Sequence, residues 1–345
     1  MNNAGKIFLA IVFSAILCFK ASAQNNNQAA DLVKEGVELH NQGKYADAIA
    51  KYTEALKIEP ENGYANYEMA FSLYASKKMT EAVPFLEKSV KSTNQSVSVG
   101  AYCLLASIYD NTNQSQKAID TYNAAIKINP DYPQIFYNLG LAYFRNKQYA
   151  EAEGSAVEAM KHNPKSASSQ RLYALVCFHQ NKRGNALAAL CTFLMLEPTG
   201  PRAAEAFTNI QSILKGGVLR DPNGSMTIPV SASDDKETGT LNLAISLSTA
   251  AAQTKKLTGV DLLEEEFKGI FSMYGQLAEK KTDKTFFDKF FAGYLYKLVQ
   301  SGNLPAFTRT ASLSAYHDEN SKWLKDNPDK LHNLADWIAK TEREL

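Results

Sequence analysis

The sequence has almost no excess of charge. Lys and Arg number 37 against 36 Asp and Glu, a formal net charge of +1 over 345 residues. No bulk electrostatic argument therefore supports binding to nucleic acid or to an anionic membrane, because both need a basic surface. The hydrophobic fraction of 45% is typical of a chain that buries a core. We expect a globular protein that does not bind nucleic acid.

The motifs of common catalytic and metal sites are also missing. No two of the five histidines stand four residues apart and none adjoins a cysteine, so the metalloprotease helix and the zinc spacings are absent. The sequence contains no Gly-x-Gly-x-x-Gly, no Gly-x-x-x-x-Gly-Lys-Ser/Thr and no Gly-x-Ser-x-Gly. The run Glu264-Glu265-Glu266 is interpreted as a charged helix face rather than an acid–base pair. We expect no enzymatic activity, no cofactor and no metal.

The first 23 residues have the pattern of a signal peptide. Lys6 precedes an apolar run from Ile7 to Phe19, and Ala21-Ser22-Ala23 is a small-x-small cleavage signal. The run is shorter than the roughly 20 residues that span a bilayer, which disfavours the alternative of a membrane anchor. A lipid-modified Cys18 is disfavoured by the large residues before it. We expect an exported protein, periplasmic or secreted, without a membrane span after signal cleavage.

A period of 34 residues governs the first half of the sequence. Pro130, Pro164 and Pro198 close helical patterns at this spacing, and Pro60 stands two periods and two residues before Pro130. Residues 97 and 98 account for the two extra positions. The resulting five repeats are 29–62, 63–96, 99–132, 133–166 and 167–200.

Small residues recur at two positions of this frame. Position 8 holds Gly36, Ala70, Ala106, Gly140 and Ala174, and position 20 holds Ala48, Ala82, Ala118, Ala152 and Ala186. Two antiparallel helices approach closely only where the facing side chains are small, so each repeat is predicted to be a helical hairpin. With this pattern the sequence resembles the tetratricopeptide repeat (TPR) family. Its departures from the family pattern are Asn66, Gln170, Asn94 and Phe193.

The resemblance implies an all-α fold. A single hairpin cannot bury its apolar face, so five TPR hairpins would stack into an α-solenoid over residues 29–215. Residues 201–215 are expected to form a capping helix, which Gly216-Gly217 ends.

No 34-residue frame fits beyond residue 215. A linker is predicted over 216–236, in which Met226 to Val230 is interpreted as extended chain rather than a strand. A C-terminal all-helical region is predicted over 237–345, with helical patterns at 239–256, 259–281, 284–301, 304–325 and 328–343. Thr258 to Asp261 fits a capping box, and Asn327-Pro328 fits an N-cap with a first helical residue.

Cysteines and aromatic stripes are interpreted as core. Cys103, Cys177 and Cys191 follow the predicted cleavage site, and we expect buried thiols without a disulfide. Two stripes of the C-terminal region have the spacing of buried helix faces. These stripes are Leu263, Phe267, Ile270, Phe271, Tyr274 and Leu277, and Phe286, Phe287, Phe290, Tyr294 and Leu298.

The resemblance also implies which side chains meet a partner. In the family, positions 2, 5, 9, 12 and 13 of the first helix of each hairpin line an inner groove. The residues predicted to line it are Tyr64, Tyr67, Phe71, Tyr74, Tyr137, Leu141, Phe144, Arg145, Arg171, Leu175, Phe178 and His179. Aromatic and Arg side chains dominate interface energies. The alternative is that some of them pack between neighbouring hairpins.

Family members that hold a C-terminal carboxylate use basic and Asn side chains where this sequence has Val33, Val37 and Glu68. An extended segment or a helix with apolar anchors is therefore the expected ligand. The favoured function is a non-catalytic scaffold that binds a protein or peptide in its groove. The alternative is an enzyme or carbohydrate-binding subunit whose site lies in the C-terminal helical region.

Overall fold

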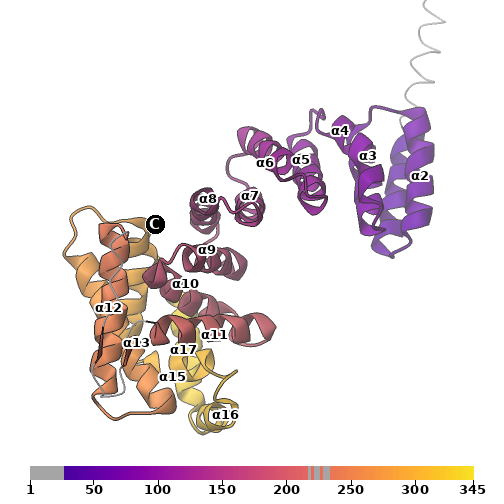
Figure 1. Ribbon diagram of the computed structural model, residues 1–345. Helices are drawn as coiled ribbons and strands as arrows, with labels where there is room; N and C mark the ends of the chain where they lie inside the picture. Colours follow the sequence, from indigo (N-terminus) through magenta and orange to yellow (C-terminus); the bar gives the residue numbers. More distant parts are fainter. Residues whose placement is uncertain (1–26, 217–218, 221–225, 228–233) are drawn as a thin grey trace, which may run out of the picture. The chain divides into compact units, whose positions relative to one another are not determined.

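The computed structural model describes residues 27–216, 219–220, 226–227 and 234–345. The predicted signal peptide and its cleavage site lie outside these residues. The described chain is all-α apart from one pair of two-residue strands, and consecutive helices form hairpins (Figure 1). The predicted fold class, an α-solenoid of helical hairpins, is confirmed. Within the described residues, no helix combines the length and the apolar character that crossing a bilayer requires.

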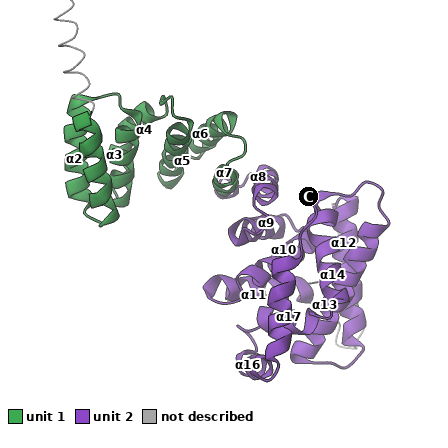
Figure 2. Cartoon of the chain, turned by 180° about the vertical axis from the view of Figure 1, so that it is seen from behind, with its two compact units in different colours: residues 1–142 green, residues 143–345 purple. Residues whose placement is uncertain are grey.

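The chain divides into two compact units, residues 1–142 and 143–345 (Figure 2). The helix α7 (Pro133–Arg145) begins in unit 1 and ends in unit 2. The other helical segments of unit 1 are residues 27–41, α2 (Tyr45–Ile58), α3 (Gly63–Ala75), α4 (Met79–Ser89), α5 (Gln95–Asn111) and α6 (Ser115–Ile128). This division does not coincide with the linker predicted at 216–236, because helices on both sides of that segment pack together in unit 2.

The turns of the hairpins recur with the spacing of the predicted repeats. In each turn one residue has a positive φ, between 57° and 76°, and this residue is always at position 15 of its repeat. The five residues are Gly43, Lys77 and Asn113 in unit 1, and Lys147 and Asn181 in unit 2. Their spacing is 34 residues except between Lys77 and Asn113, where it is 36. Residues 97 and 98 lie inside α5, so the insertion lengthens a helix.

Small residues let the paired helices approach, as the frame predicts. Ala48, Ala82 and Ala118 are fully buried. A Cβ added at Gly36 would collide with the ring of Tyr52, which is itself fully buried. Position 20 and position 8 are thus contact points where the helices of a hairpin exclude any larger side chain.

The three polar departures from the family pattern, Asn66, Gln170 and Asn94, have local hydrogen-bonding roles. The buried Asn66 donates from Nδ2 to the carbonyl oxygens of Pro60, at 3.1 Å, and Asn62, at 2.9 Å. Gln170 in unit 2 donates in the same way to Pro164, at 2.8 Å. Asn94 caps α5, because its side chain accepts from the Val97 amide. These polar side chains hold the start of a first helix to the loop before it.

Unit 2 continues with hairpins and adds the C-terminal helices. Its elements are α8 (Tyr149–His162), α9 (Ala167–His179), α10 (Arg183–Leu196), α11 (Pro201–Lys215), β1 (Leu219–Arg220), β2 (Met226–Thr227), α12 (Lys236–Gln253), α13 (Gly259–Glu279), the π-helix η1 (Asp288–Ala292), α14 (Gly293–Gln300), α15 (Leu304–Ala311), α16 (His317–Asp326) and α17 (Pro328–Lys340). All residues of the first aromatic stripe except Leu277, and all of the second except Phe286, are buried.

Two expectations for the C-terminal region were wrong. Residues 226–227 form a strand antiparallel to 219–220, which pairs backbone groups that an isolated extended chain would leave open. The pattern 304–325 is two helices, α15 and α16. The segment predicted to be helical at 284–301 consists largely of the π-helix η1 followed by α14. Residues 228–230 and Gly217 lie outside the described residues.

The predicted side-chain caps are also absent at two helix starts. Thr258 makes no capping hydrogen bond to α13, and Asp261 instead forms an ion pair of 2.8 Å with Arg309. Asn327 stands at the predicted N-cap position of α17, but its side chain donates to the carbonyl of Trp323 at 2.8 Å instead of capping the helix. Pro328 does occupy the first turn as predicted.

The core of unit 2 is centred on α10. Every residue from Gly184 to Met195 is buried. This helix contacts α9 and α11 of the repeats as well as α12, α15 and η1. A Cβ at Gly184 would collide with Leu241 of α12, and the Gly184 amide donates to Oδ1 of Asn242 at 3.2 Å. The last repeat is thus built into the C-terminal helices.

Candidate functional site

The first helix of the second hairpin presents an aromatic surface in unit 1. We define the α3 face as Tyr64, Tyr67, Phe71 and Tyr74, none of which is buried. Tyr64 and Phe71 keep 46% and 39% of their surface exposed. The rings of Tyr67 and Phe71 stack with centroids 6.1 Å apart. This exposed stack can receive apolar or planar groups of a partner.

His40 extends the α3 face from the preceding repeat. Its ring stacks on Phe71 at 4.8 Å and meets Tyr45 edge-on at 5.1 Å, while Nδ1 lies 2.7 Å from Oγ of Ser72. Burial lowers the pKa of His40, which favours the neutral ring. Sequence reasoning missed this residue although it occupies position 12 of the first repeat.

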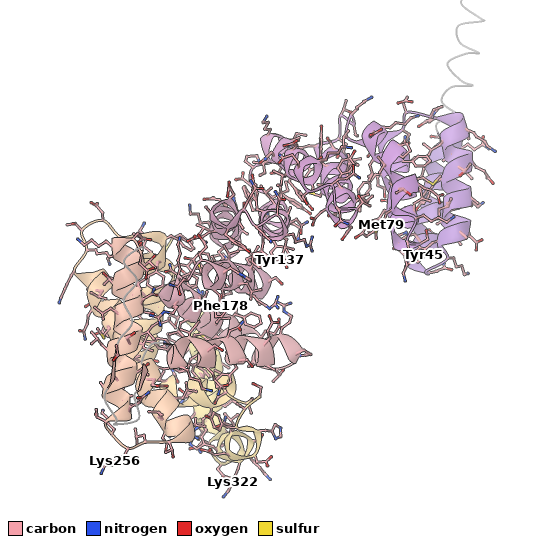
Figure 3. All side chains as sticks on the ribbon, in the orientation of Figure 1. Tyr45, Met79, Tyr137, Phe178, Lys256 and Lys322 are labelled. Atoms are coloured by element: carbon pink, nitrogen blue, oxygen red, sulfur yellow. The ribbon has the colours of Figure 1, made fainter. Side chains whose placement is uncertain are left out.

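Glu68 provides the acidic group beside this face. Burial raises the pKa of its carboxyl, and a hydrogen bond from Tyr64 opposes that rise. The Tyr67 ring fills the space over Gly100 of α5, where an added Cβ would lie 3.2 Å from it. The α3 face is thus backed by the next hairpin on one side. Unit 1 also carries Tyr137 on α7, which is partly exposed (Figure 3). Leu141 of the same helix is partly exposed as well.

A second aromatic group lies in unit 2. We define the α9 face as Phe144, Tyr149, Phe178 and His179. Tyr149 and His179 stack at 5.4 Å, and Phe144 lies 5.7 Å from the first and 5.2 Å from the second. Phe178, on α9, remains 38% exposed (Figure 3). Tyr149 was not predicted, but it begins a second helix at position 17, as Tyr45 does in the first repeat.

The remaining predicted residues of unit 2 have mixed roles. Arg171 forms an ion pair with Glu205 of α11 at 2.6 Å, so its charge is shared with the capping helix. Leu175 is partly exposed and Arg145 is exposed. None of the twelve predicted groove residues belongs to the buried core of either unit.

Polar groups also gather among the C-terminal helices. Lys281 lies 2.8 Å from Asp288 and 2.9 Å from Glu237, and Thr285 donates to both carboxylates. These groups line a cavity of about 330 Å³ with Thr240 and Asp283, among others. Because the Lys281 ammonium forms ion pairs with both carboxylates, we interpret the cluster as an internal network that holds η1 to α12 and α13.

Glu266 is an isolated buried acid of α13. Burial raises the pKa of its carboxyl to about 7. It lines a cavity of about 200 Å³ with Thr249, whose buried hydroxyl has no partner among the described residues, and with Tyr316. A carboxyl with this pKa changes charge near neutrality and can respond to pH.

The cysteines after residue 26 are free thiols. Cys177 and Cys191 are fully buried and Cys103 is partly buried. Burial raises the pKa of Cys103 to about 12 and raises those of the other two as well. Thiols with raised pKa values are poor nucleophiles. Among the described residues, no group of three His, Cys, Asp or Glu side chains is placed to hold a metal ion.

Known protein families match the first half of the chain. Residues 39–102 and 133–166 match two models described as "Tetratricopeptide repeat", and residues 101–147 match one described as "TPR repeat". Tetratricopeptide repeat protein 6 of Homo sapiens is 27% identical over 139 residues, which are 38% of this chain and 25% of the relative. Photosystem I assembly protein Ycf3 of Synechococcus sp. (strain CC9311) is 27% identical over 126 residues, 36% of this chain and 54% of the relative.

The chain therefore spans about a quarter and about half of the lengths of these two curated relatives. Among solved structures, a crystal structure of MamA has a TM-score of 0.44 with 23% identity and covers 47% of this chain and 94% of its own. The TPR protein YrrB has a TM-score of 0.46 with 18% identity and covers 55% and 97%. The sequence frame, the hairpins and the family matches together show that residues 39–166 of the chain are tetratricopeptide repeats.

Proposed function

We propose that the protein is a non-catalytic scaffold of the periplasm or cell exterior that binds another protein or a peptide through the α3 and α9 faces. Tetratricopeptide repeats act as protein-interaction scaffolds, and one relative is by name an assembly protein. The observation that carries the proposal is the exposure of aromatic side chains at the frame's inner positions. A chain that needed these rings only for its own core would bury them.

The chemistry of the two faces favours a ligand with apolar anchors. In each unit a histidine stacks on an aromatic ring of that unit's face. His40 stacks on Phe71 in unit 1, and His179 stacks on Tyr149 in unit 2. Exposed rings can bury large areas against a partner with little loss of side-chain freedom. A near-neutral chain gives no bulk attraction to polyanions. An extended segment or an amphipathic helix is the ligand that fits.

The proposed location follows from the N-terminal sequence. Lys6, the apolar run Ile7 to Phe19 and the Ala21-Ser22-Ala23 signal form the three parts of an export signal. Edman sequencing of the protein purified from its native cells tests this point, with Gln24 as the expected first residue. Retention of Met1 on the mature protein would contradict it.

The alternative function, a catalytic or carbohydrate-binding site in the C-terminal helices, has less support. Its strongest candidate is the polar cluster around Lys281. The carboxylates of that cluster bond to Lys281 and to Thr285, so internal contacts already account for their placement. A catalytic pair would need at least one group directed at a substrate.

A variant of both faces tests the scaffold proposal. Tyr67→Ala combined with Phe144→Ala removes one ring from each face. We expect folding to be retained and partner capture from the native cell envelope to fall, by about 1 kcal/mol or more of binding free energy for each ring. The control is Leu243→Ala with Leu331→Ala, which removes two exposed apolar side chains outside both faces. Equal recovery of partners by the folded test variant and the control would refute the use of these faces.

A further inference from the structure

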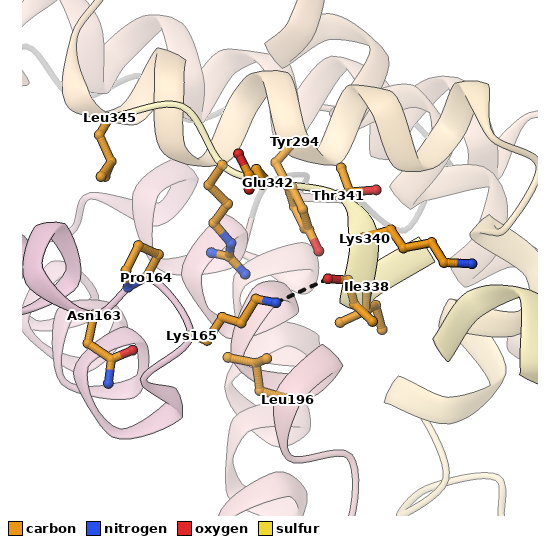
Figure 4. Close-up of a pocket in the computed structure, with 12 residues that line it drawn as sticks. Asn163, Pro164, Lys165, Leu196, Tyr294, Ile338, Lys340, Thr341, Glu342 and Leu345 are labelled. Carbon is orange, nitrogen blue, oxygen red and sulfur yellow. Dashed lines mark hydrogen bonds between the residues drawn. The ribbon is translucent and has the colours of Figure 1, made fainter. Parts of the chain in front are cut away.

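A cavity in unit 2 lies between the α8–α9 connection and the last residues of the described chain (Figure 4). Its volume is about 460 Å³, within the range of small-molecule sites. Pro164, Leu196 and Ile338 line it with apolar surface. It is separate from both aromatic faces and from the Lys281 cluster.

The walls of this cavity carry two cations without acidic partners. Among the described residues, neither Lys165 nor Arg343 has a carboxylate oxygen within ion-pair distance. Lys165 donates only to the carbonyl oxygen of Ala339, at 3.1 Å, as the dashed line in Figure 4 shows. A third lining cation, Lys340, is already paired with Asp336 at 2.7 Å.

Arg343 is held firmly at this site. Its guanidinium carbon lies 4.7 Å from the ring centre of Phe290 and 4.5 Å from that of Tyr294, so two rings stack on it. Its buried Nη1 has no hydrogen-bond partner within the part of the chain that the structure describes. Burial lowers the pKa of Arg343 to about 10, which still leaves it charged at neutral pH. A buried cation with an unmet donor is costly unless an acceptor is supplied.

The guanidinium also bonds to the Tyr294 side chain, but no described residue supplies an acceptor to Nη1. Glu342 is the one acidic side chain among the lining residues, and it forms no ion pair with Lys165 or Arg343. Arg343 is fixed by stacking rather than by a carboxylate, and its planar guanidinium matches a carboxylate or phosphate group. The apolar lining matches an uncharged body attached to that group.

We propose that this cavity binds a small amphiphilic anion, with a carboxylate or phosphate group between Arg343 and Lys165 and an apolar body against Pro164, Leu196 and Ile338. The anion supplies the acceptor that the guanidinium lacks. The ammonium of Lys165 exchanges its bond to a main-chain carbonyl for a bond to the ligand. The site is independent of the scaffold function, because none of its residues belongs to the α3 or α9 face.

Fluorescence of Trp337 provides the measurement. Its ring lies 4.8 Å from that of Tyr294, which stacks on Arg343, and the chain has only one other tryptophan, Trp323. The full-length protein carrying Trp323→Phe is titrated with hexanoate, hexyl phosphate and the neutral 1-hexanol. We expect saturable binding of at least one anion in the millimolar range or tighter, and binding of 1-hexanol at least about tenfold weaker. The tighter of the two anions identifies the preferred head group.

Three variants in the same background locate the site. Arg343→Gln is expected to weaken anion binding by about tenfold or more, and Lys165→Gln by about threefold or more. Lys161→Gln, which removes a neighbouring exposed cation outside the cavity, should bind like the parent. Lys165 is exposed, so its variant keeps the test valid if Arg343→Gln fails to fold. Absence of anion binding, equal binding of 1-hexanol, or parent-like binding by Lys165→Gln overturns the proposal.

Discussion

The helices α6 and α10 occupy the same place in their repeats but differ in what surrounds them. In α6 the buried residues are Ala118, Ile119, Tyr122 and Ala125, a single stripe. In α10 burial extends over every residue from Gly184 to Met195. The difference arises because α10 contacts α12, α15 and η1 in addition to repeat helices. The second helix of a hairpin can therefore bury a single stripe in one unit and be enclosed on all sides in the other.

The two helices share one buried position and differ at another. The alanines at position 20 are fully buried in both units, as Ala118 and Ala186 show. Two residues later, position 22 is an exposed Asp120 in α6 and a fully buried Ala188 in α10. The hairpin contact is thus common to both units, and the opposite side of the second helix is where they diverge.

Exchanging the residues at position 22 gives the largest expected effect. Ala188→Asp places a carboxylate inside unit 2 without a partner, which costs several kcal/mol and is expected to unfold that unit. Asp120→Ala removes only a surface hydrogen bond from Gln116 and should change stability by less than about 0.5 kcal/mol. Urea unfolding followed by far-ultraviolet circular dichroism measures both. Similar small losses in the two variants would mean that α10 is not enclosed.

Acids in the two units should respond differently to pH. The Glu266 carboxyl has an ordinary pKa of 4.5 and a folded value of about 7, so between these values the folded chain holds a proton that the unfolded chain has released. The free energy of unfolding therefore falls as pH rises through this window, by a total on the order of 3 kcal/mol. Glu266→Gln should flatten the slope and raise stability at pH 8 relative to the parent.

Glu68 of unit 1 is the matched control for that slope. Burial raises its pKa in the same direction, but the hydrogen bond from Tyr64 opposes the rise and its side chain is only half-buried. Glu68→Gln should leave most of the pH dependence in place. A slope that disappears with Glu68→Gln and persists with Glu266→Gln would contradict the assignment to unit 2.

Enlarging the shared hairpin contact should have an intermediate effect. Ala118→Leu inserts a larger side chain at a position that is fully buried, as Ala106 of the paired helix is, and is expected to cost about 1 to 3 kcal/mol. Ala50→Leu, at the exposed position 22 of the first repeat, is the control and should change little. Urea midpoints of the two variants measure the difference. A parent-like midpoint for Ala118→Leu would show that the repeat frame is misplaced.

The repeats could be predicted from sequence because their contacts are local and periodic. The 34-residue spacing of the prolines and small residues is matched by the positive-φ residues of the hairpin turns, and the two extra residues appear as the 36-residue spacing between Lys77 and Asn113. The same frame also places His40 at position 12, one of the positions expected to line the groove, although it was not among the predicted groove residues. The charge-free run from Gly184 to Leu196 likewise indicated a helix buried on all sides.

The rest of unit 2 could not be predicted because it depends on contacts between distant residues. The local sequence predicts that Asp261 caps a helix, but in the folded chain its carboxylate forms an ion pair with Arg309. The anion cavity brings Lys165, Tyr294 and Arg343 together, and nothing in their sequence spacing indicates that they meet. Local patterns predict helices and hairpins, whereas charge pairs between separate helices follow only from the tertiary structure.

The smallest expected effect concerns the exposed rings. Phe71 of the α3 face and Phe178 of the α9 face are 39% and 38% exposed, so replacing either with Ala should cost about 1 kcal/mol of stability or less. Phe267, fully buried in α13, should lose about 3 to 5 kcal/mol in the same substitution. The two exposed rings should behave alike although their units differ, because the loss depends on the ring's own burial. Urea unfolding of the three variants measures this. A loss at Phe178 close to that of Phe267 would assign the α9 face to the core of unit 2 and leave the α3 face as the remaining candidate for partner binding.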